Sequence, residues 1–388
     1  MMRLFDNTEI AFSLKSDSEL ERAYFLFKMI SNQPLVRIGT AATNFALKAN
    51  LPVEGLIRST VFDHFCGGVN EEDCLKVIEA QYEKGVSSVL DYSVEGKEAE
   101  EQFDSAMRKV LKIVSFCKER SAMPIVVFKP TGFGRFALYE KKSSVEVLTA
   151  EEQKEWERVV GRFDQVCRIS KENDVEVLID GEESWMQDAA DALVEEMMRR
   201  YNTEKPIVYN TLQCYRWDRL DYLKSLHERA HKHNFLVGMK IVRGAYMEKE
   251  RLRAEEKGYP SPICATKADS DKSFNNSMSY ILNNLDRISV FIGSHNEESC
   301  YMAMELIEKL GIDKKDNRVW FGQLYGMSDH ISFNMAKLGY NVAKYVPFGP
   351  VKDVMPYLIR RAEENTSVAG QTNRELELIK KERSRRKI

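Results

Sequence analysis

The sequence predicts an α/β protein whose main domain is a (βα)8 barrel of the TIM type, preceded by N-terminal helices. From Gly85 onward, short apolar runs rich in β-branched residues alternate with longer stretches of helical periodicity, and this alternation is typical of a parallel sheet. Eight such strand–helix units fit a closed barrel better than an open sheet. In addition, a polar residue stands at or beside the end of each predicted strand, where the active sites of such barrels lie.

The residues before the barrel have helical patterns and no strong strand signal. Helices are predicted over Ser18–Ser31, Thr40–Ala49 and Asn70–Lys84. We therefore expect residues 1–80 to form a helical arm. Residues 81–388 would form the catalytic barrel domain, including a C-terminal helix with two adjacent arginines and a basic tail.

The barrel strands are predicted from their apolar, β-branched composition. They are Val86–Tyr92, Pro124–Lys129, Val175–Asp180, Ile207–Gln213, Leu236–Val242, Val290–Ser294, Val319–Gln323 and Val342–Val346. The predicted helices cover residues 98–118, 151–173, 185–201, 215–233, 271–286, 297–310 and 328–338. The polar residues at the strand ends are Asp91, Lys129, Asp180, Gln213, Arg243, His295, Gln323 and Tyr345. Any one of them could be a helix cap or a loop residue, but eight together predict a site at one rim of the barrel.

The composition excludes several classes of protein. A chain of 388 residues with 43% hydrophobic residues can bury a large core. A net charge of −3 gives no indication of nucleic-acid binding. The seven cysteines form no C-x-x-C pair and the six histidines no H-E-x-x-H motif, so we expect neither a metal site nor a disulfide framework.

The sequence predicts a cytoplasmic protein. No apolar run is long enough to span a bilayer, and the mean hydropathy is −0.42. The early acidic residues Asp6, Glu9 and Asp17 are unlike a signal or transit peptide. The basic tail Lys380–Lys387 is interpreted as a frayed helix end whose charge suits the helix dipole, with peripheral contact to an anionic membrane surface as the alternative.

The segment Tyr357–Asn365 is a candidate binding motif for a small carboxylic acid. It places Arg360 and Arg361 on a predicted helix, with Glu364 one turn further on. Guanidinium groups bind planar carboxylates through paired hydrogen bonds. An exposed helix end with an Arg–Glu pair is the alternative, and it is the commoner arrangement for such a motif alone.

A second candidate motif is Lys240–Tyr246. Gly244 directly after a strand lets the backbone approach a ligand closely, while Lys240 and Arg243 bring positive charge. The alternative is a glycine turn with two surface cations.

A dinucleotide-binding motif is not expected. Residues Gly132–Ala137 match G-x-G-x-x-A, but Pro130 separates them from the preceding strand, and no second strand ending in an acidic residue follows at the required spacing.

Taken together, the ordered motifs resemble a known family. They are Lys129, Asp180-Gly-Glu-Glu183, Gln213, Lys240–Tyr246, Ser294-His-Asn296, Gln323, Tyr345–Gly349 and Tyr357–Asn365, and the segment from Asp91 to Glu95 also fits. Their order and spacing resemble proline dehydrogenase, the FAD-dependent enzyme of proline catabolism, and within it the single-function, eukaryotic-style branch. The resemblance extends from about Gly55 to Glu382 and implies a distorted (βα)8 barrel.

The resemblance implies a role for each matching residue. Those implied to bind the substrate are Lys129, Asp180, Ile241, Tyr246, Tyr345, Tyr357, Arg360 and Arg361, of which Lys129, Asp180, Tyr345, Arg360 and Arg361 are assigned to catalysis. Those implied to contact FAD are Gln213, Lys240, Val242, Gly244, Lys267, His295, Gln323 and Glu364. The sequence departs from common family choices at Gly181, Lys240, Ile241, Met247 and Tyr325, and none of these departures removes a charge that the chemistry needs.

The implied reaction is the oxidation of L-proline to Δ1-pyrroline-5-carboxylate by hydride transfer to flavin N5, with electrons passed on to a quinone. No side chain accepts a hydride, so such a reaction requires a cofactor. No general base is identified, and Asp180 is a candidate only by position. The alternatives are a hydroxyproline dehydrogenase of the same fold, a barrel aldolase with Lys129 or Lys240 as Schiff-base nucleophile, and a non-enzymatic interaction protein.

Overall fold

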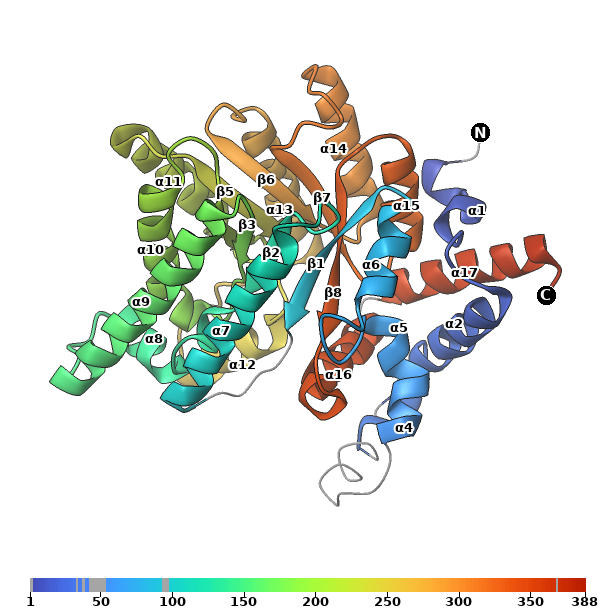
Figure 1. Ribbon diagram of the computed structural model, residues 1–388, viewed down its shortest axis with the longest axis horizontal. Coiled ribbons are helices and arrows are strands. Elements are labelled where there is room, and N and C mark those ends of the chain that lie inside the picture. Colours follow the sequence, from blue (N-terminus) through green and yellow to red (C-terminus); the bar gives the residue numbers. More distant parts are fainter. Residues whose placement is uncertain (1–2, 33, 37–38, 42–53, 93–97, 368) are drawn as a thin grey trace. The chain divides into compact units, whose positions relative to one another are not determined.

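The computed structural model describes residues 3–32, 34–36, 39–41, 54–92, 98–367 and 369–388, excluding the side chains at 54, 56, 59 and 362–372. Its strands are β1 (Val86–Tyr92), β2 (Ile125–Phe128), β3 (Glu176–Ile179), β4 (Val208–Gln213), β5 (Val237–Val242), β6 (Ile288–Gly293), β7 (Val319–Leu324) and β8 (Val342–Phe348). They follow one another in chain order around a closed barrel (Figure 1). The predicted (βα)8 class is confirmed, and each strand overlaps the predicted one.

Helices precede, separate and follow the strands. They are α1 (Thr8–Ala11), α2 (Asp17–Ile30), α4 (Glu54–Ile57), α5 (Asp63–Phe65), α6 (Leu75–Tyr82), α7 (Glu100–Cys117), α8 (Phe136–Ser143), α9 (Ala150–Glu172), α10 (Ser184–Tyr201), α11 (Arg219–His233), α12 (Met247–Lys257), α13 (Lys267–Leu282), α14 (Glu297–Lys309), α15 (Asp329–Lys337), α16 (Val351–Ser367) and α17 (Ala369–Arg386). Among the described residues, no helix has both the length and the apolar character that a membrane span requires.

The chain divides into two compact units, residues 1–95 with 322–388, and residues 96–321. The boundary predicted near residue 80 stays a prediction.

In the unit formed by residues 96–321, strands β2 to β6 pair side by side in parallel register. These strands are buried at almost every position, which explains why they are continuous rather than alternating apolar runs in the sequence. Near the carboxyl ends of the strands, Phe128 pairs with Ile179 and Gln213 pairs with Val242. The polar residues that end these strands therefore lie along one edge of the sheet.

Local capping explains where several helices of this unit begin. Thr149 and Thr266 each form a capping box at the start of α9 and α13, so α13 starts four residues before the predicted helix 271–286. The predicted helix 215–233 starts only at Arg219, because Arg216 forms a β-bridge with Ile263. Helices α8 and α12 were not predicted; α12 is mostly charged and lacks an apolar periodicity.

In the other unit, β1 pairs with β8 in parallel. The predicted helix Ser18–Ser31 is confirmed as α2, and Asn70–Lys84 is shortened to α6. The predicted helix Thr40–Ala49 lies almost wholly outside the described residues.

Helices α1, α2 and α17 share one apolar cluster. It consists of Ala11, Phe12, Leu20, Ala23, Phe27, Leu378 and Ile379.

The basic tail is part of this packing. Arg383 Nε donates to Glu21 at 2.6 Å, and Arg386 Nη1 donates to Asp17 at 3.0 Å, both carboxylates belonging to α2. The tail that was predicted to fray is therefore helical as far as Arg386, and its arginines form ion pairs with carboxylates.

Candidate active site

The predicted site residues of the unit 96–321 stand at successive strand ends. Lys129 follows β2, Asp180 follows β3, and Gln213 ends β4. Lys240 lies on β5, and His295 comes shortly after β6. Because the strands are parallel and in register, their carboxyl ends face the same way, as the position of a barrel active site requires.

Lys240 and Asp180 form a direct ion pair between Nζ and Oδ1. Lys240 is buried and Asp180 is partly exposed. The structure thus brings together a residue predicted to contact the cofactor and one predicted to lie in the substrate pocket.

Strand alternation divides the predicted residues of β5 between two faces. Lys240 and Val242 share one face with Thr211 and Gln213, their register partners on β4. Ile241 is fully buried on the opposite face, so the structure does not bring it to the other predicted substrate residues.

That opposite face is directed toward the surrounding helices. On β4 it includes Asn210, whose side chain donates to Asp191 of α10 and to Tyr222 of α11 at 2.9 and 3.1 Å. Ile241 accordingly packs in the layer between strand and helix.

Glu182 was not singled out from the sequence, yet it links the ends of three strands. Its carboxylate accepts hydrogen bonds from the Thr131 backbone N–H at 2.9 Å and from the Thr131 hydroxyl at 2.7 Å. Its backbone carbonyl accepts from Gln213 Nε2 at 2.6 Å. Burial raises the pKa of Glu182 to about 7, and the Lys129 ammonium and the bonds from Thr131 limit that rise. The only signal in the sequence was its place within the tetrad that follows a strand.

The loop after β5 requires glycine at position 244. Gly244 has φ +125°, and a Cβ there would lie 2.6 Å from the ring of Tyr215. Both features explain the glycine, because the backbone is in a conformation that other residues rarely adopt and packs directly against the Tyr215 ring.

Arg243 beside it is fixed by its neighbours. Its guanidinium donates to Asp271 at 2.7 Å, to Ser294 at 3.2 Å and to Ser299 at 2.9 Å. Lys267 bonds the second oxygen of Asp271 at 2.6 Å.

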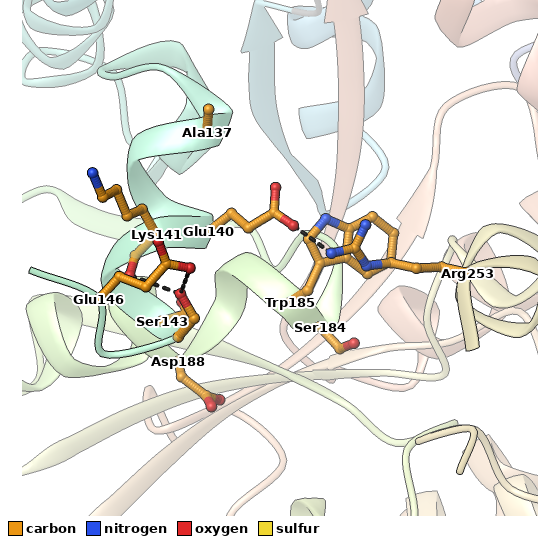
Figure 2. Close-up of a pocket in the computed structure, with 10 residues that line it drawn as sticks. Ala137, Glu140, Lys141, Ser143, Glu146, Ser184, Trp185, Asp188 and Arg253 are labelled. Atoms are coloured by element: carbon orange, nitrogen blue, oxygen red, sulfur yellow. Dashed lines mark hydrogen bonds and ion pairs between the residues drawn. The ribbon is translucent and has the colours of Figure 1, made fainter. Parts of the chain in front are cut away.

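A separate cavity lies between α8, the N-terminus of α10 and α12 (Figure 2). Arg253 forms an ion pair with Glu140 and lies 4.5 Å from the ring centre of Trp185. None of the predicted site residues lines this cavity.

The predicted residues of the unit containing 322–388 lie on β7, β8 and α16. Tyr345 on β8 is 8% exposed and Gln323 on β7 is 2% exposed. Ser332 donates to Gln323 Oε1 at 2.8 Å, so the Gln323 amide nitrogen is directed away from Ser332.

Helix α16 carries the arginine motif. Tyr357 is buried, while Arg360 and Arg361 are partly exposed. The Arg361 guanidinium lies 5.2 Å from the ring centre of Tyr357, a cation–π arrangement. The side chain of Glu364 is outside the described part of the chain.

Comparison with known proteins agrees with this geometry. The family model "Proline dehydrogenase" matches residues 74–374. The carbapenem antibiotics biosynthesis protein CarD of Pectobacterium carotovorum is 37% identical over 86% of this chain and 87% of its own length. Mitochondrial proline dehydrogenase 1 of Arabidopsis thaliana is 32% identical over 97% of this chain and 85% of its own. A hydroxyproline dehydrogenase of Xenopus laevis is 29% identical over 97% of this chain and 88% of its own.

Solved structures show the same fold. Proline utilization A (PutA) of Bdellovibrio bacteriovorus superimposes with a TM-score of 0.70 at 23% identity, over 94% of this chain. The chain spans only 37% of that larger protein.

The barrel and the charged residues at its strand ends define the class, an enzyme of the (βα)8 type. The match over most of the sequence specifies it further: the chain belongs to the proline dehydrogenase family.

Proposed function

We propose that this chain oxidises L-proline to Δ1-pyrroline-5-carboxylate with bound FAD and passes the electrons to a quinone. The family match supports proline oxidation. The observation that carries the finer proposal is the contact between Lys240 and Asp180, because it joins a residue predicted to contact the flavin to one predicted to contact the substrate.

The residues at the strand ends fit a flavin. Gly244, which has a positive φ and lacks a Cβ, lets the loop after β5 pass closely over the Tyr215 ring at this rim of the barrel. Gln213 commits its Nε2 to a carbonyl and so offers its Oε1 as an acceptor, while Lys240 supplies a positive charge. When bound, FAD would supply the hydride acceptor that the oxidation requires and the electron carrier that links it to the quinone.

The chain's own residues would bind and orient the substrate. Arg360, Arg361 and Lys129 would hold the proline carboxylate through charge-assisted hydrogen bonds, which converts an encounter into a fixed geometry. Tyrosine rings would form apolar walls with polar ends around the substrate ring and exclude water. They are Tyr246, Tyr345 and Tyr357.

The substrate amine must be neutral before it is oxidised. The nearby cations would favour its deprotonation, because like charge disfavours the ammonium form.

An absorption spectrum of the purified protein tests the proposal. We expect a flavin band that bleaches when L-proline is added anaerobically and returns when a soluble quinone is added. A protein that stays colourless after incubation with FAD and does not turn over proline contradicts it. In that case, borohydride trapping of a carbonyl substrate on Lys129 or Lys240 would support the aldolase alternative.

Contact with a membrane through the basic tail is a weaker proposal, because Arg383 and Arg386 are already paired with carboxylates of α2. Sedimentation with anionic vesicles, compared between wild type and Arg383→Gln/Arg386→Gln, would measure it. Equal binding by both proteins would rule the tail out.

A further inference from the structure

We propose that Glu182 is a positioning residue that holds the turn after Lys129 and the side chain of Gln213 in fixed relation. The inference rests on the proposed function, in which Lys129 binds the substrate carboxylate and Gln213 contacts FAD. It concerns a residue that contacts neither ligand in the proposed scheme.

The first link runs from the Glu182 side chain to β2. Lys129 is followed by a short 3-10 turn, Pro130–Gly132. The two oxygens of Glu182 accept the N–H and the hydroxyl of Thr131 at the centre of that turn. We call this pair of bonds the Thr131–Glu182 bridge. Because Lys129 lies only two residues before Thr131, the bridge restricts where its backbone can lie.

The second link runs from the Glu182 backbone to β4. The Glu182 carbonyl accepts from Gln213 Nε2 at 2.6 Å, in a buried setting. This bond turns the amide nitrogen of Gln213 toward Glu182. The other end of the amide, Oε1, is then directed away from Glu182 and can accept a hydrogen bond. A displacement of residues 181–183 would therefore move or rotate the Gln213 side chain.

The segment is held on its other side by a bridge of the same type. Ser184 donates both its backbone N–H and its hydroxyl to Glu250 of α12, each at 2.6 Å. The Ser184–Glu250 bridge does not involve the turn after β2. Ser184→Ala provides the control, because it removes the hydroxyl bond of this second bridge from the same segment.

The Thr131–Glu182 bridge can form whether the Glu182 carboxyl is ionised or protonated. Near neutral pH its carboxyl can be protonated, and the neutral acid can donate to the Thr131 hydroxyl while its other oxygen accepts the N–H. A carboxamide can do the same. Glu182→Gln is accordingly expected to preserve the geometry, whereas Glu182→Ala removes it.

The experiment compares these variants in the holoenzyme. Glu182→Ala should raise KM for proline about tenfold. This is the change expected when Lys129 is displaced enough to lose about one hydrogen bond to the substrate. It should also increase flavin loss on gel filtration, while kcat with the flavin that remains changes less. Glu182→Gln should stay within about threefold of wild type in KM. Thr131→Val, which lacks the hydroxyl, should raise KM as Glu182→Ala does. Thr131→Ser, which keeps the hydroxyl, should have the wild-type KM.

A second readout does not depend on turnover. Hydrogen–deuterium exchange across residues 129–134 should speed up in Glu182→Ala and stay near wild type in Ser184→Ala. Ser184→Ala should lower stability without raising KM.

The outcomes separate the two proposals. A folded Glu182→Ala protein with wild-type KM, flavin retention and exchange overturns the role of Glu182 and leaves the proposed function standing. An equal rise of KM in Ser184→Ala also overturns it, since any loosening of the segment would then suffice. A wild-type protein that neither binds FAD nor oxidises proline overturns both.

Discussion

Lys344 on β8 extends its ammonium to the carboxylate of Asp329, 2.6 Å away, where α15 begins. Lys344 is 1% exposed, and Met327 O accepts a second bond from it at 2.7 Å. Burial raises the pKa of Asp329, but the charges of Lys344 and Lys15 outweigh that effect and hold its pKa well below the ordinary range. The pair fixes the turn after β7. Three residues after Asp329, the Ser332 hydroxyl donates to Gln323 on that strand.

Lys344→Met should destabilise the protein by about 3–5 kcal/mol, because it leaves a buried carboxylate without its main partner. Urea unfolding measures the loss. Lys15→Met is the control: Lys15 lies 3.4 Å from the same carboxylate but is more exposed, so about 1 kcal/mol is expected. Equal losses from both substitutions would show that Lys344 has no special role.

Arg360→Met and Arg361→Met should each raise KM for proline about tenfold or more, because bonds to charged groups contribute about 1.5–3 kcal/mol each. Steady-state kinetics provides the measurement. Lys352→Met, on an exposed position of the same helix, should leave KM unchanged. If the arginine variants also keep the wild-type KM, the motif is an exposed helix face.

Tyr345→Ser should shift specificity toward 4-hydroxyproline, because the smaller side chain leaves room for the additional hydroxyl. The ratio of kcat/KM for the two substrates should change by about tenfold or more, whereas Tyr345→Phe, which keeps the ring, should change it little. A wild-type enzyme that prefers hydroxyproline would reverse the substrate assignment.

Gly244→Ala should lower stability and flavin retention together. The new Cβ would meet the Tyr215 ring at 2.6 Å in a backbone with φ +125°, and strain of this kind costs about 1–3 kcal/mol before the clash is added. Gly258→Ala is the matched control, since Gly258 also has a positive φ, +70°, but open space around it. Flavin release that is equal in the two variants would count against a cofactor next to Gly244.

Glu182 should make stability depend on pH. Its pKa rises from 4.5 to about 7 on folding, mainly through burial. A carboxyl whose pKa is raised in the folded state contributes stability that is fully present below about pH 4.5 and is lost as the pH rises through 7. Lys129 opposes the shift and Glu183 adds to it.

Glu182→Gln removes this titration, so the variant should gain stability relative to wild type as the pH rises, by up to about 3 kcal/mol. Urea unfolding at a series of pH values measures the difference. A constant difference between pH 4.5 and 8 would mean that Glu182 does not titrate in this range.

Much of the barrel could be predicted from the sequence because buried parallel strands are short apolar runs. Strand β1 matches its prediction at both ends, and the end of β5 at Val242 is also matched. Helix α12 could not be predicted, because its eleven residues are mostly charged and only Glu250 and Ala254 are buried. Its position depends on the tertiary bond between Glu250 and Ser184, which no local pattern indicates.

The candidate site was predictable only in part. Strand ends located Lys129, Asp180 and Gln213, because polar residues after apolar runs are visible in a sequence. Glu182 could not be recognised, because its role arises from bonds to Thr131 and Gln213, each about 30 to 50 residues away along the chain. Ile241, by contrast, was predicted as a site residue because it belongs to the Lys240–Tyr246 motif. The alternation of side chains along β5 directs it toward the helices instead.

The cluster shared by α2 and α17 has a consequence for biosynthesis. Phe27 leaves the ribosome about 350 residues before its partners Leu378 and Ile379, an interval of roughly 20 to 70 s at typical rates of translation. During that time the apolar side of α2 can pack against Ala11 and Phe12 but not against Leu378 and Ile379 of α17. Helix α2 is therefore made long before its packing can be completed, and its apolar side chains stay without their α17 partners until translation reaches Leu378 and Ile379.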